Sequence, residues 1–247
     1  MITTHPRQRA DAAALDMAVA GGAQLVLLAV LWATVGLGAV GWLAGIGYVL
    51  VVTGLLGGGL HRTGRTWLGP ADRVTLARAV LVGLVTALVV DRLPGGMPVV
   101  ALVAIAAVAL VLDGVDGRVA RRTGTSSALG ARFDMEIDSV LVLVLSIHVA
   151  TTVGAWVLLI GLMRYAYIAA SRLWPWLRAT LPARYSAKTV AAVQGIVLVV
   201  AAAGVLPGAL TALLVGVALV LLVWSFGRDV VLLWRRAHVP APADAAC

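Results

Sequence analysis

Four aspartates stand close together at the ends of otherwise apolar runs: Asp113, Asp116, Asp134 and Asp138. Asp113 and Asp116 are three residues apart and Asp134 and Asp138 four, so each pair would share one face of a helix. The two helices would be consecutive and antiparallel, and the four carboxylates would then converge at one depth. Burying such carboxylates costs roughly several kcal/mol unless something pairs with them. The pattern predicts a site for Mg²⁺, Mn²⁺ or Ca²⁺, because these hard cations prefer oxygen ligands.

Small residues lie on the same faces as the aspartates. Gly117 follows Asp113 by four residues and Ala120 follows it by seven, while Gly130 lies one turn before Asp134. Small side chains leave the backbone open to a ligand or a neighbouring helix. Two cations among the aspartates could bridge a pyrophosphate and neutralise charge as a phosphoanhydride breaks. A polar helix pair joined by salt bridges is the alternative, although such pairing does not require this spacing.

The complete pattern reads Asp113-x2-Asp116-Gly117-x2-Ala120-Arg121-x8-Gly130-x3-Asp134-x3-Asp138. It resembles the full signature of the CDP-alcohol phosphotransferases, a family with a core of six transmembrane helices. The resemblance implies metal ligands at Asp113, Asp116, Asp134 and Asp138. Asp138 would also serve as the general base. A CDP site would be lined by Gly117, Ala120 and Arg121, with Gly130 giving the backbone room. The resemblance also implies two bound cations, Mg²⁺ or Mn²⁺, and a homodimer.

The implied reaction moves a substituted phosphate group from a CDP-linked donor to an alcohol and releases CMP. We expect CDP-diacylglycerol as the donor, because a site within the membrane suits a lipid, and the product would then belong to phospholipid biosynthesis. The mirrored reaction, transfer of a CDP-linked polar alcohol to diacylglycerol, stays open, as does the acceptor alcohol. An intramembrane cation transporter or channel lined by Asp residues is an alternative from another class. It does not explain the small residues and the arginine at fixed offsets.

Two arginines are further candidates for the nucleotide or substrate site. Arg78 follows Thr75 by three residues, and related enzymes often show a Thr-x-x-Arg element there. Arg78 could contact the nucleotide phosphates, or its charge could reach the membrane interface. Arg164 lies deep in an apolar run, at the expected depth of the aspartates, where a charge needs a partner. We expect it to bind a phosphate or head group of a substrate, or to pair with an aspartate. Glu136 points away from the face of Asp134, so we place it outside the metal site.

The composition indicates an integral membrane protein. Hydrophobic residues make up 62% of the 247 residues, charged residues 12%, and the mean hydropathy is +1.02. A soluble domain could not shield so much apolar surface from water. A membrane helix needs roughly 20 apolar residues. Suitable runs lie at about 18–39, 41–60, 73–91, 96–119, 130–151, 154–172, 187–205 and 208–227. The sequence therefore predicts an all-α polytopic fold of eight helices, a six-helix core preceded by a hairpin.

Basic residues gather in segments that an even number of helices would place on one side of the membrane. These segments are the N-terminal tail, the loops at 61–72, 120–132 and 172–188, and the C-terminal segment. The positive-inside rule puts both termini in the cytoplasm, and the pocket of the aspartates would open to the same side. We expect the chain to lie in the cell membrane, in contact with its lipids. Because the basic residues sit between apolar runs, we expect no nucleic-acid partner.

The chain is divided as follows on these grounds. We expect a cytoplasmic tail at 1–17, an N-terminal transmembrane hairpin at 18–60, a CDP-alcohol phosphotransferase membrane domain at 61–236 and a flexible tail at 237–247. The stretch 61–72 is expected to lie along the membrane surface.

Overall fold

The computed structural model describes the backbone of residues 6–65, 67–93, 95–123, 127–179 and 185–238. Within these ranges, the side chains of residues 6–11, 116, 118–123, 185 and 186 lie outside the description. The described residues form eight α-helices and two short 3-10 turns, with no strand among them. The helices are α1 (Pro6–Val35), α2 (Ala39–Thr63), α3 (Pro70–Arg92), α4 (Val99–Thr123), α5 (Ala128–Val153), α6 (Leu158–Leu173), α7 (Tyr185–Ala202) and α8 (Gly208–His238). The turns are η1 (Ala155–Val157) and η2 (Pro175–Arg178). This confirms the predicted all-α fold of eight helices.

Among the described residues, six helices are long and apolar enough to cross a membrane: α1, α2, α3, α5, α8 and the segment formed by η1 and α6. The other two, α4 and α7, contain shorter apolar stretches, Val99–Val115 and Ala187–Ala202. A single chain with this many apolar helices is a multi-pass membrane protein.

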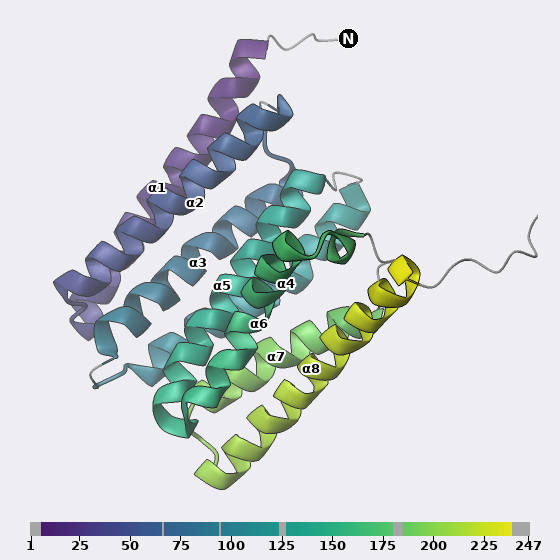
Figure 1. Cartoon of the computed structure of the whole chain (residues 1–247). Helices are drawn as coiled ribbons and strands as arrows, with labels where there is room; N and C mark the ends of the chain where they lie inside the picture. The colour runs from purple at the N-terminus through teal and green to yellow at the C-terminus, as the bar shows by residue number, and fades with distance from the viewer. Residues whose placement is uncertain (1–5, 66, 94, 124–126, 180–184, 239–247) are drawn as a thin grey trace, which may run out of the picture.

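Helix α3 lies at the centre of the packing. It contacts α1 and α2 on one side and α4 and α5 on the other, and Figure 1 shows the α1–α2 pair along one edge of the bundle and α8 at the opposite edge. In the most apolar 18-residue stretch of α3, 67% is buried, compared with 22% in the corresponding stretches of α1 and α2. A helix surrounded by other helices must be apolar on all sides, which explains the continuous run of Val, Leu and Ala in α3.

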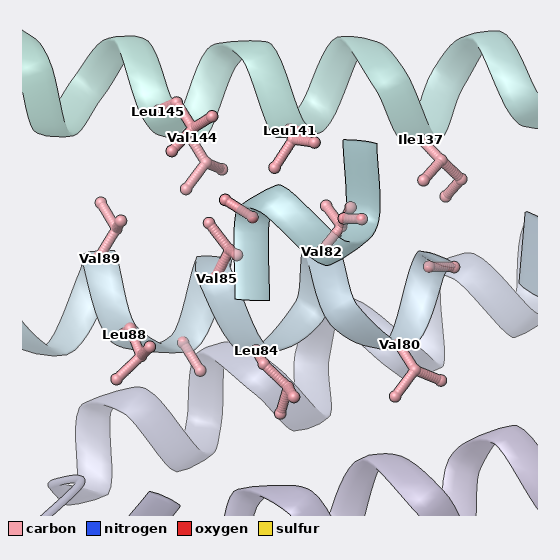
Figure 2. Packing of buried hydrophobic residues seen from close by; sticks show 14 of the residues in the cluster. Val80, Val82, Leu84, Val85, Leu88, Val89, Ile137, Leu141, Val144 and Leu145 are labelled. Atoms are coloured by element: carbon pink, nitrogen blue, oxygen red, sulfur yellow. The ribbon is translucent and has the colours of Figure 1, made fainter. Parts of the chain in front are cut away.

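The side chains of α3 point in opposite directions, some toward α5 and others away from it (Figure 2). Figure 2 shows Val85 and Val89 pointing toward Val144 and Leu145 of α5, whereas Leu88 points the other way. All five residues belong to one buried cluster. The pairing of α3 with α5 sets the distance between any polar residues that these two helices carry.

The N-terminal hairpin is fastened to the end of α3 by two adjacent charged residues. The carboxylate of Asp91 accepts hydrogen bonds from the backbone N–H groups of Gly38 (2.9 Å) and Gly41 (3.1 Å) and so caps the start of α2. Arg92 donates to the carbonyl oxygens of Val35 (2.8 Å) and Gly36 (2.5 Å) at the end of α1. These contacts fix the turn between α1 and α2 against the core.

The structure shows where the helices of the N-terminal half begin and end. The first helix begins at Pro6, well before the apolar run at 18, because helix formation does not require an apolar face throughout. Helices take up both ends of the stretch 61–72, because α2 continues through Thr63 and α3 begins at Pro70. The place of this stretch along the membrane surface stays a prediction. Gly64 ends α2 with a left-handed φ of 64°, and a proline at the first position suits the start of a helix. The division at 1–17, 18–60, 61–236 and 237–247 stays a prediction.

Candidate active site

Three of the four predicted aspartates come together between α4 and α5. Asp113 projects from α4, and Asp134 and Asp138 project from neighbouring turns of α5. One carboxylate oxygen of each lies within 4.8 Å of those of the other two. The i, i+4 spacing on α5 and the antiparallel course of the two helices produce this convergence. The side chains of Asp116, Ala120 and Arg121 lie outside the described residues, while Gly117 continues α4 one turn beyond Asp113 and is partly buried.

The third helix at the site is α3, which contributes Arg78. Its side chain is fully buried, with 0% of its surface exposed. Nη1 lies 3.0 Å from Oδ1 of Asp113 and 2.5 Å from Oδ1 of Asp134, and Nη2 pairs with Asp138. A guanidinium at such a buried position requires paired charges. Of the two interpretations of Arg78, a charge that reaches the membrane interface is therefore wrong.

The aspartates are accessible from outside the protein even though Arg78 is not. The side chains of Asp113 and Asp138 are 41% exposed and that of Asp134 is 33% exposed. Each carboxylate has two oxygens, so contact with Arg78 leaves acceptor positions available. A single guanidinium cannot neutralise three carboxylates, and divalent cations can supply further positive charge. An all-oxygen ligand set at this separation fits Mg²⁺ or Mn²⁺.

Gly130 has a structural role that differs from the expected one. It lies in the first turn of α5, and a Cβ atom at this position would come closer than 3.0 Å to Oδ1 of Asp72 in α3. The missing side chain therefore leaves room for a buried carboxylate of the protein itself. Contact between Gly130 and a nucleotide stays a prediction.

Arg164 has a partner that sequence reasoning did not anticipate. Its Nη2 lies 2.5 Å from Oε1 of Glu136, so α6 and α5 are joined by an ion pair. Glu136 lies outside the cluster of Asp113, Asp134 and Asp138. It is the acid that Arg164 contacts. Both side chains are partly exposed, at 25% for Arg164 and 48% for Glu136. Contact of Arg164 with a substrate stays a prediction.

Sequence reasoning did not single out the residues that hold the first turn of α5, Arg65, Asp72 and Ser127. Ser127 is the N-cap residue, and its Oγ accepts a hydrogen bond from the Gly130 N–H at 2.9 Å. An acid after Pro70 in the first turn of a helix is a known start signal and could have identified Asp72. No sequence signal identifies Arg65.

The comparison with protein families agrees with this geometry. The family model of CDP-alcohol phosphatidyltransferase matches residues 69–224, more than half of the chain, from the residue before α3 into α8. This chain belongs to the CDP-alcohol phosphatidyltransferase family. Comparisons with curated proteins and with solved structures gave no match. The N-terminal hairpin of α1 and α2 precedes the matched residues.

Membership of the CDP-alcohol phosphatidyltransferase family makes the protein a transferase of substituted phosphate groups, with a CDP-alcohol as donor and an alcohol as acceptor. Members of the family generally use divalent metals. In this CDP-alcohol phosphatidyltransferase, the group of Asp113, Asp134 and Asp138 could hold a metal ion.

Proposed function

We propose that this enzyme transfers a phosphatidyl group from CDP-diacylglycerol to an alcohol, releases CMP and acts in phospholipid biosynthesis. The observation that carries the proposal is the convergence of Asp113, Asp134 and Asp138 on buried Arg78, with all three carboxylates at least one-third exposed. A site that combines the buried guanidinium of Arg78 with accessible carboxylate oxygens suits a diphosphate bound together with metal ions.

The metal ligands in this proposal are Asp113, Asp116, Asp134 and Asp138, which would hold two ions, Mg²⁺ or Mn²⁺. When bound, such ions neutralise a pyrophosphate and the charge that develops on the departing CMP. Arg78 lies beside the ligands, and its planar guanidinium can donate two parallel hydrogen bonds to phosphate oxygens. Gly117, Ala120 and Arg121 would contact the CDP moiety.

Asp138 is the proposed general base. The acceptor hydroxyl attacks the phosphorus that carries the diacylglycerol group, and a new oxygen–phosphorus bond forms. The bond from this phosphorus to the oxygen that leaves with CMP breaks, and the hydroxyl proton moves to the Asp138 carboxylate. A base must come within hydrogen-bonding distance of the proton it removes. The 41% exposure of the Asp138 side chain allows a hydroxyl to approach it.

The partly exposed guanidinium of Arg164 is proposed to bind a phosphate or head group of a substrate. The basic link between α2 and α3 and the basic end of α8 favour a cytoplasmic site with both termini on the same side. We place the enzyme as a homodimer in the inner or plasma membrane, with its lipid substrate taken from the surrounding bilayer.

The test is CMP release by the purified protein in phosphatidylglycerol vesicles containing CDP-diacylglycerol, with Mg²⁺ or Mn²⁺ and a panel of acceptors: serine, glycerol phosphate and inositol phosphate. Wild-type protein should release CMP only with metal and one acceptor, and Asp138→Asn should release at least about 100-fold less, because general-base catalysis contributes 10²–10⁴-fold.

Asp16→Asn is the control for that test. It also neutralises an acid, but Asp16 lies on α1 of the hairpin and pairs with Arg73 of α3. Release only from a CDP-linked polar alcohol with diacylglycerol would establish the mirrored reaction instead. No CMP from any donor, together with metal-ion flux across the vesicle membrane, would contradict the proposal and favour a transporter.

A further inference from the structure

The first turn of α5 is tied to the N-terminal hairpin, outside the residues that the family model matches. Arg65 belongs to the link between α2 and α3, and its Nη1 donates to the Oγ of Ser127 at 2.5 Å. Ser127 is the N-cap of α5, the helix that carries two of the clustered aspartates. The hydroxyl of Ser127 therefore receives one hydrogen bond from its own helix, at Gly130, and one from Arg65.

The same arginine also reaches the start of α3. Its Nη2 lies 3.5 Å from Oδ2 of Asp72, which accepts a hydrogen bond from the Gly69 N–H at 3.0 Å. The Asp72 side chain is only 6% exposed and occupies the space beside Gly130. Arg65 thus bridges the first turn of α3 and the cap of α5 with the two arms of one guanidinium, a geometry that lysine cannot reproduce.

Apolar packing brings α2 to the same turn of α5. A Cβ atom at Gly59 of α2 would lie 2.6 Å from Cδ1 of Leu129, so the leucine fills the space that the glycine leaves. The end of α2, the link that follows it and the start of α3 therefore all contact the residues between Ser127 and Gly130.

We infer that Arg65 is a positioning residue for the active site and that the N-terminal hairpin sets the placement of α5 through it. Asp134 and Asp138 follow Gly130 by four and eight residues, so they lie one and two turns further along a continuous helix. Because a helix is stiff over this length, a displaced first turn moves both carboxylates relative to Asp113 on α4. The inference rests on the proposed function, since the displacement matters through the metal ions and the substrate.

Metal binding is the most direct measure of this placement. Arg65→Ala should weaken the binding of Mn²⁺, followed without turnover by the loss of the free-ion electron paramagnetic resonance signal, by about three- to tenfold. Mutation of residues that hydrogen-bond to metal ligands typically changes metal affinity by about 10–100-fold. Arg65 contacts the N-cap of the helix that carries the ligands rather than the ligands themselves, so we expect a smaller effect. The Mn²⁺ concentration for half-maximal CMP release should rise by the same factor, while kcat at saturating Mn²⁺ should change less than about threefold.

Two variants separate positioning from loss of charge or of fold. Arg62→Ala removes an exposed arginine from the last turn of α2 and should bind Mn²⁺ as the wild type does. Arg65→Lys retains one of the two contacts and should fall between the wild type and Arg65→Ala. Amide hydrogen exchange in residues 128–133 should be faster in Arg65→Ala than in Arg62→Ala.

Wild-type Mn²⁺ affinity in Arg65→Ala would overturn the inference, whether or not hydrogen exchange increases, because the arginine would then stabilise the helix start without placing the ligands. Equally weakened Mn²⁺ binding in Arg62→Ala would also overturn the inference, since the loss of affinity would then follow from the change in net charge. Failure of the wild type itself to release CMP would instead count against the proposed function.

Discussion

Replacement of Arg78 by methionine tests the central feature of the site. The substitution keeps a long apolar side chain in the core and removes the positive charge that contacts Asp113, Asp134 and Asp138. Removal of one partner from a buried ion pair costs about 3–5 kcal/mol. The three carboxylates are 41%, 33% and 41% exposed, so water can solvate them after the guanidinium is gone. The expected loss of stability in metal-free buffer is therefore near the lower limit, about 3 kcal/mol.

The loss is measured by thermal unfolding of the purified protein in detergent with a chelator. For a chain of this size, each kcal/mol corresponds to roughly 2–4 °C, so Tm should fall by about 6–12 °C. Added Mg²⁺ should raise the Tm of Arg78→Met more than that of the wild type, because the cation and the guanidinium contact the same carboxylates. Activity should not return with Mg²⁺, since the arginine is also proposed to bind phosphate oxygens.

The control for Arg78→Met is Arg73→Met on the same helix. The Arg73 side chain is 58% exposed and pairs with Asp16 at the surface, so its replacement should cost less than about 1 kcal/mol. If Arg78→Met unfolds at the wild-type temperature in chelator, or if Mg²⁺ stabilises it less than the wild type, then Arg78 and the metal do not share the aspartates and the reasoning fails.

Two further predictions concern the contacts that hold the helices around the site. Gly130→Ala should lower stability by about 1–3 kcal/mol in chemical denaturation, because the added methyl group meets the Asp72 carboxylate. Gly216→Ala, where a Cβ meets nothing within 4 Å, should be neutral or stabilising, and equal losses in both would refute the steric explanation. Asp91→Ala should cost about 0.5–2 kcal/mol, because it removes the cap of α2. It should also increase proteolysis of the α1–α2 turn, and unchanged cleavage would contradict the proposed anchoring.

The helices and the aspartate group could be predicted because their signals are local. An apolar run marks each helix that crosses the membrane, and Gly64 followed by Pro70 marks the link between α2 and α3. Asp134 and Asp138 are four residues apart on one helix, so their common direction follows from helix geometry alone. Their meeting with Asp113 needs one further assumption, that α4 and α5 run antiparallel and bring these turns to one depth. In the structure both helices pack against α3.

The environments of the arginines could not be predicted in this way, because they depend on how each helix is rotated about its axis. Between Ala79 and Val90, helix α3 is almost entirely apolar on all sides, so this part of its sequence does not show which face meets α4 and α5. Arg78 could therefore be assigned to the interface or to the site with equal reason. Glu136 lies on a different face of α5 from Asp134, and only the packing of α6 against that face makes it the partner of Arg164.

The same packing connects the hairpin, for which the sequence suggested no role, to the chemistry. Helix α3 carries polar residues at three levels: Asp72 at its start, Arg78 within the bundle and Asp91 at its end. Asp72 contacts Arg65 of the link, and Asp91 caps α2, so the hairpin is attached to both ends of α3. Arg78 lies between these two attachments and contacts all three clustered aspartates. A shift of the hairpin would move α3, which among the described side chains brings Arg78 to the carboxylates of α4 and α5. We therefore expect the two N-terminal helices to affect the active site although they precede the matched residues.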